Sequence, residues 1–213
     1  MKKILFIIIL FVFFLPLRAQ ISFSGSMGID YFASQSLRDY LNMNFPSNSG
    51  LISTFVSSVG FYGELEIPVA ANIDLGAEYV YQIYSYSSPS MSGGVYNFYL
   101  DQHKISIIGY YVIHGEGYQF KFGAGAGIRL AVVDEEIYSS TNYKSAGYGF
   151  LVNAKGITPL GNKLFGNIGV EARYDLPGEP DNNGRKIFNS TINKDVNINS
   201  FSIGLKIGLT YFF

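Results

Sequence analysis

The sequence contains no cysteine, which excludes a disulfide, a lipid-modified N-terminal cysteine and a cysteine-based metal site. It has only two histidines, His103 and His114, and they form no cluster of metal ligands. Charged residues make up 15% of the chain, against about 25% in typical soluble domains. The formal net charge of −1 provides no basic field for nucleic acid, so we expect no nucleic-acid partner.

Long apolar runs are also scarce, apart from residues 4–17. This run follows Lys2 and Lys3 and is shorter than the roughly 20 residues of a spanning helix. Small and polar residues follow it at Ala19 and Gln20. The pattern predicts a signal peptide over residues 1–19 and a single mature domain over residues 20–213, with an uncleaved anchor as the alternative.

Glycine, tyrosine and phenylalanine are abundant, and apolar residues alternate with small or polar ones over long stretches. The clearest alternation runs from residue 197 to residue 213. A period of two over this length indicates a strand longer than the usual 5 to 6 residues, and it suits the roughly 9 to 11 residues that cross a bilayer. The apolar face of this strand consists of Phe201, Ile203, Leu205, Ile207, Leu209, Tyr211 and Phe213.

Seven further strands precede this one, at residues 21–31, 54–67, 73–84, 103–113, 118–133, 147–157 and 164–175. Long polar connections follow the odd-numbered strands, at residues 33–53, 85–102, 134–146 and 176–196. Short turns follow the even-numbered ones, at residues 68–72, 114–117 and 159–163. This arrangement predicts an all-β fold, an eight-stranded antiparallel up-and-down transmembrane barrel. The alternative is a soluble barrel with an apolar interior, but its polar face would be poor in charge for a water-exposed surface.

The chain resembles small eight-stranded outer-membrane β-barrels related to the OmpA membrane domain, in the version common among Bacteroidota. The resemblance consists of the signal peptide, the alternating strands and the terminal Phe213. It implies the outer membrane of a Gram-negative bacterium, with both termini periplasmic. It also implies contacts with outer-membrane lipids and lipopolysaccharide, and a C-terminal signal for the barrel-insertion machinery at Leu209, Tyr211 and Phe213.

Charged residues occur on the face that we expect to line the lumen. Acidic residues come from the first three strands and basic ones from the next three, so an acidic wall should face a basic wall. The last two strands complete the ring with residues of both signs. Because isolated charges in a narrow space are costly, we expect ion pairs across a filled lumen. The residues of this predicted network are Asp30, Glu64, Glu66, Asp74, Glu78, Lys104, Lys121, Arg129, Lys155, Glu171, Arg173 and Lys206. The alternative is an ion path, or acid and base chemistry by Glu64 and Glu66.

Other candidate motifs are weak. Gly123, Gly125 and Gly127 lack the spacing of a dinucleotide-binding loop, so no cofactor is expected. His103 and Ser106 invite comparison with lipid-modifying outer-membrane enzymes, but residues three apart on a strand face opposite ways. We therefore expect a structural or surface-interaction protein that acts through long loops and is not an enzyme. A narrow channel and a lipid-modifying enzyme are the alternatives, and the sequence does not identify an extracellular ligand.

Overall fold

The computed structural model describes residues 20–46, 50–89, 94–136 and 139–213. The predicted signal peptide, residues 1–19, lies outside these described residues. One helix and eight long strands follow in the order β1 Ser22–Ala33, α2 Gln35–Asn44, β2 Val56–Ala70, β3 Ile73–Pro89, β4 Val95–Gly115, β5 Tyr118–Glu136, β6 Ser140–Pro159, β7 Leu164–Leu176 and β12 Ser200–Phe212. Between β7 and β12 lie the two-residue strands β8 Asp181–Asn182, β9 Arg185–Lys186, β10 Phe188–Asn189 and β11 Lys194–Asp195.

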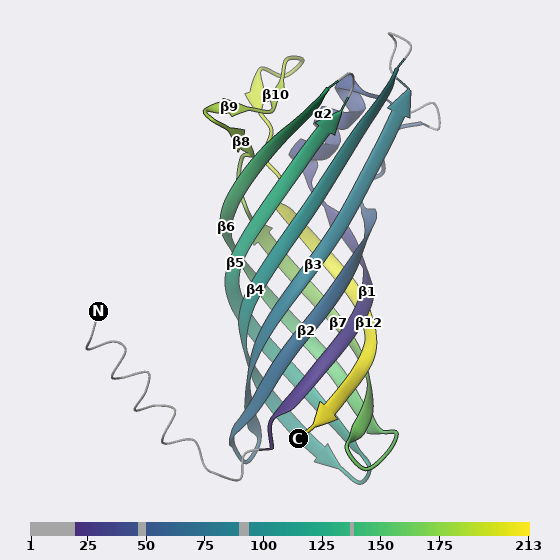
Figure 1. The fold of residues 1–213 in the computed structure, drawn as a ribbon, viewed down its shortest axis with the longest axis vertical. Coiled ribbons are helices and arrows are strands. Elements are labelled where there is room, and N and C mark those ends of the chain that lie inside the picture. Colours follow the sequence, from purple (N-terminus) through teal and green to yellow (C-terminus); the bar gives the residue numbers. More distant parts are fainter. Residues whose placement is uncertain (1–19, 47–49, 90–93, 137–138) are drawn as a thin grey trace, which may run out of the picture.

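The eight long strands form a closed ring. Each pairs antiparallel with its neighbours in the chain, and β12 pairs with β1 to close the cylinder (Figure 1). Following paired residues round the ring from Phe23 leads back to β1 at Ala33, ten positions farther along. This stagger in a ring of eight corresponds to a strand tilt of about 40°. The predicted eight-stranded antiparallel barrel is confirmed.

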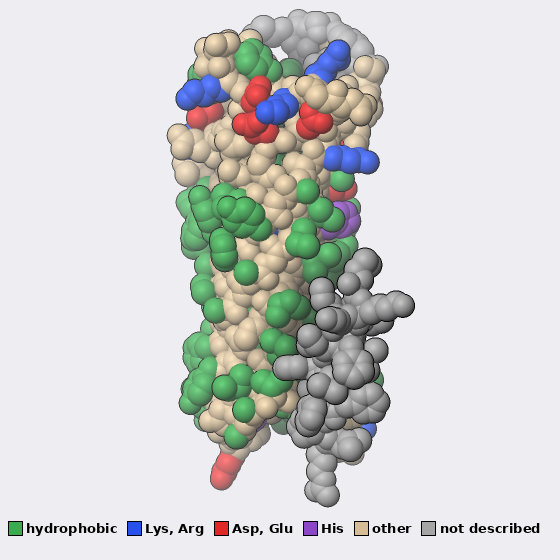
Figure 2. Space-filling model, turned by 90° about the vertical axis from the view of Figure 1, so that its left-hand side faces the viewer, with side chains coloured by type: hydrophobic (Ala, Val, Ile, Leu, Met, Phe, Trp, Pro, Cys, Tyr) green, Lys and Arg blue, Asp and Glu red, His purple; other side chains and the backbone are tan. Residues whose placement is uncertain are grey.

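The wall of the barrel has the reverse polarity of a soluble protein. Apolar side chains point outward and are well exposed, as at Ile168 (63%) and Ile207 (64%). Figure 2 shows hydrophobic side chains spread over the wall of one face, while most of the Lys, Arg, Asp and Glu side chains of that face gather at one end. Serines, glycines and charged residues on the alternate positions point inward. The apolar face of the strands therefore faces away from the interior.

Short turns join the strands at one end, which we call the turn end. Residues 71–72, 116–117 and 160–163 make these turns, close to the predicted positions. Gly117 has a φ of 77°, a backbone conformation that favours glycine. The C-terminus also lies at the turn end (Figure 1). Helix α2 and residues 177–199 lie at the opposite end, which we call the crown.

The predicted long loops at the crown are partly wrong. Residues 33–53 include helix α2, and residues 85–102 and 134–146 are mostly strand, because β3, β4, β5 and β6 extend into the crown. In β4 the inward side chains of this extension are apolar, namely Tyr96, Phe98 and Leu100, and the polar residues point outward. The alternation is therefore inverted relative to the rest of the barrel wall, where apolar side chains point outward. An inverted pattern rich in tyrosine and asparagine resembles a polar loop when only the sequence is known.

Helix α2 packs over the crown end of the lumen. Leu37 and Leu41 are almost fully buried in an apolar cluster, the crown core. The hydroxyl of Tyr40 donates a hydrogen bond to Glu135 at 2.8 Å. The crown core consists of Phe32, Leu37, Tyr40, Leu41, Tyr84, Tyr96, Phe98, Leu100, Ala131, Val133, Tyr143, Ile187, Val196 and Ile198. Within the described ranges, no helix is long and apolar enough to cross a membrane.

Candidate functional site

The lumen is the candidate functional site, and the structure places all twelve of the predicted charged residues in it. Eleven of them are at most 5% exposed, and Asp74 is half-buried. Eleven of them, all but Asp30, belong to three clusters, which we call lower, middle and upper in order from the turn end toward the crown. Each cluster contains at least one ion pair that joins strands on different parts of the wall.

The lower cluster is built around two lysines. The Lys121 ammonium contacts Glu66 at 2.8 Å and Asp74 at 2.6 Å. The Lys155 ammonium contacts Glu64 at 2.8 Å and Glu66 at 2.6 Å. Because β5 and β6 supply the lysines and β2 and β3 supply the carboxylates, these pairs cross the lumen. Tyr110 supports the cluster by donating to Glu64 at 2.5 Å and accepting from Asn153 at 3.0 Å.

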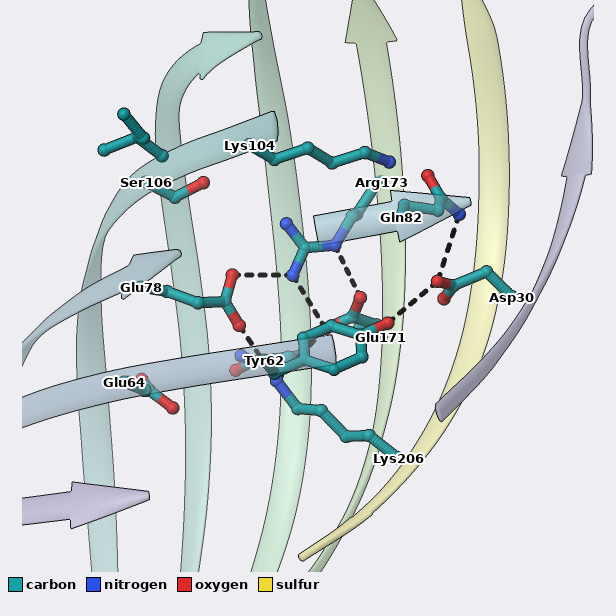
Figure 3. Close-up of polar contacts among 12 residues, drawn as sticks. Asp30, Tyr62, Glu64, Glu78, Gln82, Lys104, Ser106, Glu171, Arg173 and Lys206 are labelled. Carbon is teal, nitrogen blue, oxygen red and sulfur yellow. Dashed lines mark hydrogen bonds and ion pairs between the residues drawn. The ribbon is translucent and has the colours of Figure 1, made fainter. Parts of the chain in front are cut away.

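The middle cluster surrounds Arg173, as Figure 3 shows. Its guanidinium bonds to Glu78 on β3 at 2.6 Å and to Glu171 on its own strand at 2.5 and 2.9 Å. The Lys206 ammonium on β12 reaches the same two carboxylates at 3.0 and 3.1 Å. Lys206 also lies 4.9 Å from the centre of the Tyr62 ring. Two cations and two carboxylates thus bridge β3 to β7 and β12.

Asp30 lies next to the middle cluster and has neutral hydrogen-bond partners. Its carboxylate accepts hydrogen bonds from Tyr62 at 2.8 Å and from Gln82 at 3.1 Å (Figure 3). Its second oxygen is buried with no hydrogen-bond partner. Asp30 is thus part of the lumen filling without being part of an ion pair among the described residues.

The upper cluster contains a residue that the sequence reasoning missed. Asp175 on β7 contacts the Lys104 ammonium at 2.7 Å and also pairs with the Arg129 guanidinium. Arg129 donates a further bond to Ser106 at 3.1 Å. Asp175 is 1% exposed and lies on the same face of β7 as Glu171 and Arg173. Asp175 is the last residue of the predicted strand 164–175, and the period of two places it on the inward face with Glu171 and Arg173.

Polar residues without charge fill the lumen near the turn end. The hydroxyls of Ser24 and Thr210 lie 2.8 Å apart, and Asn167 donates to Thr210 at 2.9 Å. Ser26 donates to Asn167 at 3.0 Å. These residues also escaped the sequence reasoning, because single serines and threonines on an inward face give no specific signal.

Glycines on the inward face of β5 allow neighbouring groups to approach the strand closely. A Cβ atom at Gly127 would collide with the backbone oxygen of Ile105, and one at Gly125 would lie 2.5 Å from the oxygen of Ile107. At Gly123 it would meet the side chains of Asn153 and Tyr110. The three glycines lie on a strand and not before a helix, so they form no phosphate-binding loop.

The catalytic alternatives find little support in the geometry. His103 faces outward and Ser106 faces inward, so they lie on opposite sides of the wall. Glu64 and Glu66 are both held in ion pairs with Lys155. No group of three or more potential metal ligands occurs in the described part of the chain.

The proposed insertion signal lies on the outer surface at the turn end. Leu209, Tyr211 and Phe213 point outward and are exposed. The rings of Tyr211 and Phe213 pack edge to face with centroids 5.1 Å apart. The backbone N–H of Phe213 donates to the oxygen of Ile21, which ties the end of the chain to β1.

Comparisons with known proteins establish the fold alone. No protein-family model and no curated protein matches this sequence. Among solved structures, the chain is similar to Neisserial surface protein A, with a TM-score of 0.51, 12% identity, and coverage of 91% of this chain and 97% of that one. It is also similar to Ail, the attachment invasion locus protein of Yersinia pestis, with a TM-score of 0.52, 9% identity, and coverage of 91% and 99%. A second Ail structure, in complex with the heparin analogue sucrose octasulfate, gives a TM-score of 0.50 at 9% identity, with coverage of 92% of this chain and 100% of that one.

Proposed function

We propose that this chain is an outer-membrane protein of a Gram-negative bacterium, related to the OmpA-like barrels, with the crown outside the cell and both termini in the periplasm. The exposed apolar wall supports this proposal, because such a surface would be a severe liability in water and is what lipid tails require. Short turns at one end and an elaborate crown at the other match the usual orientation of these barrels.

The proposed role is structural or surface-interacting, with a barrel that does not conduct. The observation that carries this proposal is the set of ion pairs that cross the lumen from β5, β6, β7 and β12 to β2 and β3. These pairs occupy the axis of a barrel whose interior is just wide enough for side chains. The crown core and α2 add an apolar layer above them. The barrel is then a rigid scaffold for the crown.

The crown is the surface that would interact with partners. Polar and charged side chains of residues 177–199 are exposed there, including the pair of Lys186 with Glu179 at 2.5 Å. Loops held by a rigid scaffold commonly carry recognition. Ail, which shares the fold, is named as an attachment protein, and this supports a surface-interaction role in this chain.

Recording from planar bilayers tests the filled lumen. Purified wild-type protein should show no unitary conductance, and neither Glu64→Gln nor the exposed turn-end control Glu116→Gln should create one. Unitary conductance that changes in Glu64→Gln but not in Glu116→Gln would contradict the proposal and establish the narrow channel. That alternative is favoured by charged residues along most of the length of the lumen.

Two further parts of the proposal have direct tests. Export through a cleaved signal peptide over residues 1–19 predicts that the mature protein begins at Gln20, which N-terminal sequencing determines. A non-enzymatic role predicts that the mass spectrum of lipid A is unchanged when the protein is overexpressed. Loss or transfer of an acyl chain in that spectrum would instead support the lipid-modifying enzyme.

A further inference from the structure

The outer wall carries one group of polar side chains that neither the lumen nor the crown accounts for. Asp101 and His103 lie on the outward face of β4, and Tyr79 and Tyr81 lie beside them on the outward face of β3. We call these four residues the wall cluster. Ionisable side chains are unusual on an otherwise apolar outer wall, so we asked what this group could bind.

Contacts within the wall cluster hold its members in fixed orientations. The Tyr79 hydroxyl lies 2.7 Å from Nδ1 of His103, and the Tyr81 hydroxyl donates to Asp101 at 3.1 Å. The His103 ring stacks against Tyr81 with centroids 5.1 Å apart and an interplanar angle of 23°. It also lies 6.1 Å from the Tyr79 ring at 27°. The cluster is therefore preorganised on a rigid sheet.

These contacts leave hydrogen-bonding capacity for a ligand. With the Tyr79 hydroxyl as donor, Nδ1 of His103 accepts and the ring proton lies on Nε2. Neither Nε2 of His103 nor the second carboxylate oxygen of Asp101 has a partner among the described residues. The cluster thus offers a donor, a charged acceptor and the exposed ring of Tyr79.

The wall cluster lies at the crown edge of the apolar wall. At a tilt of about 40°, each residue advances about 2.5 Å along the barrel axis. His103 is eight residues from Tyr111, an outward aromatic near the turn end of β4, and so lies about 20 Å above it. Asp101 lies about 5 Å higher. Since the apolar band of such barrels is about 25 Å tall, the cluster is level with lipid headgroups of the outer leaflet.

The charge of the site selects among headgroups. The residues paired with Asp101 are Ile83 and Val132, and those paired with His103 are Tyr81 and Leu130, so no Lys or Arg pairs directly with the cluster. The nearest outward cation in the same row is Lys144 on β6, which pairs with Val132 and is therefore two strands away from Asp101. A phosphate held by His103 would meet the Asp101 carboxylate, and Lys144 would be two strands away. Sugar hydroxyls can donate to that carboxylate and accept from Nε2, and a sugar ring can pack on Tyr79.

We propose that the wall cluster binds the sugar headgroup of a glycolipid in the outer leaflet. The proposal rests on the proposed outer-membrane location for the identity of the leaflet. Binding of the headgroup can be measured on the purified barrel, whatever its location in the cell. Cell fractionation therefore tests the location, and the experiment below tests the site independently.

Native mass spectrometry of the purified folded protein can measure the preference. The probes are diglucosyl diacylglycerol and phosphatidylglycerol with identical acyl chains, so that contacts of the chains with the apolar wall cancel. Wild type should bind the glycolipid about tenfold more tightly, as two hydrogen bonds to a sugar would produce. His103→Phe and Asp101→Asn should each remove most of this preference while the barrel stays folded by circular dichroism. His114→Phe, which changes the exposed histidine near the turn end, should leave it intact.

Equal binding of the two lipids by wild type would overturn the proposal. Tighter binding of phosphatidylglycerol would also overturn it and assign the cluster to a phosphate. A preference that survives in both His103→Phe and Asp101→Asn would place glycolipid binding elsewhere on the wall.

Discussion

Removing the carboxylate of Asp175 should strongly destabilise the barrel. Asp175 is 1% exposed and is the partner of both Lys104 and Arg129. The change Asp175→Asn keeps the size of the side chain but leaves two buried cations without an anion. Breaking a buried pair in this way costs about 3–5 kcal/mol, and we expect the upper part of that range because two cations are affected. The free energy of unfolding should fall by about 5 kcal/mol.

The matched control is Asp195→Asn in the crown. Asp195 contacts Lys186 at 3.3 Å, and its side chain is 38% exposed, so solvent screens the pair. Its loss should have little effect on the free energy of unfolding, because exposed pairs are weak. Urea unfolding from lipid vesicles, followed by far-ultraviolet circular dichroism because the chain has no tryptophan, measures both variants. If Asp175→Asn cost no more than Asp195→Asn, the ion pairs of the lumen would not be the tight structural contacts inferred here.

Three other changes probe the packing. Gly127→Val should prevent or severely slow folding, because its side chain would collide with the backbone at Ile105. The control Gly25→Val, at a position where a Cβ has open space, should fold normally. Gel mobility before and after boiling measures folding in both variants. Leu41→Ala should cost about 2–5 kcal/mol through the cavity in the crown core and should speed proteolysis of α2. Burial raises the pKa of Tyr40 above its ordinary value of 10.0, so the stability from this group is present below pH 10 and is lost as the pH rises further. The free energy of unfolding, measured from pH 9 to pH 11, should therefore fall less steeply with pH in Tyr40→Phe than in wild type. An equal slope in the two proteins would contradict a role of Tyr40 in this pH dependence.

The wall of the barrel could be predicted from the sequence because its physical rule is simple. Lipid on one side and a narrow lumen on the other impose opposite chemistry on successive residues, which is visible in Ile203, Leu205 and Ile207 against Ser202, Gly204 and Lys206. The same alternation placed Gly123 and Lys121 on the inner face. The number of strands and the positions of the short turns followed from this period.

The crown could not be predicted in the same way, because there the surroundings change. Beyond the apolar wall the outside is polar and the inside is apolar, so Phe98 and Leu100 point inward and Asn97 outward. Helix α2 is stabilised by contacts of Leu37 and Leu41 with distant strands, and such contacts leave no local signal. Which charged residues pair with each other in the lumen depends on the register of all eight strands round the ring. The sequence of a single strand does not determine this register.

The central claim is that the apolar face of the strands contacts lipid, and cysteine labelling tests it most directly, since the chain has no native cysteine. In the folded protein in vesicles, Ile168→Cys and Ile207→Cys should react with a membrane-soluble maleimide and resist a water-soluble one. Lys194→Cys in the crown should react with both. Rapid labelling of Ile168→Cys and Ile207→Cys by the water-soluble reagent would contradict a lipid-facing wall.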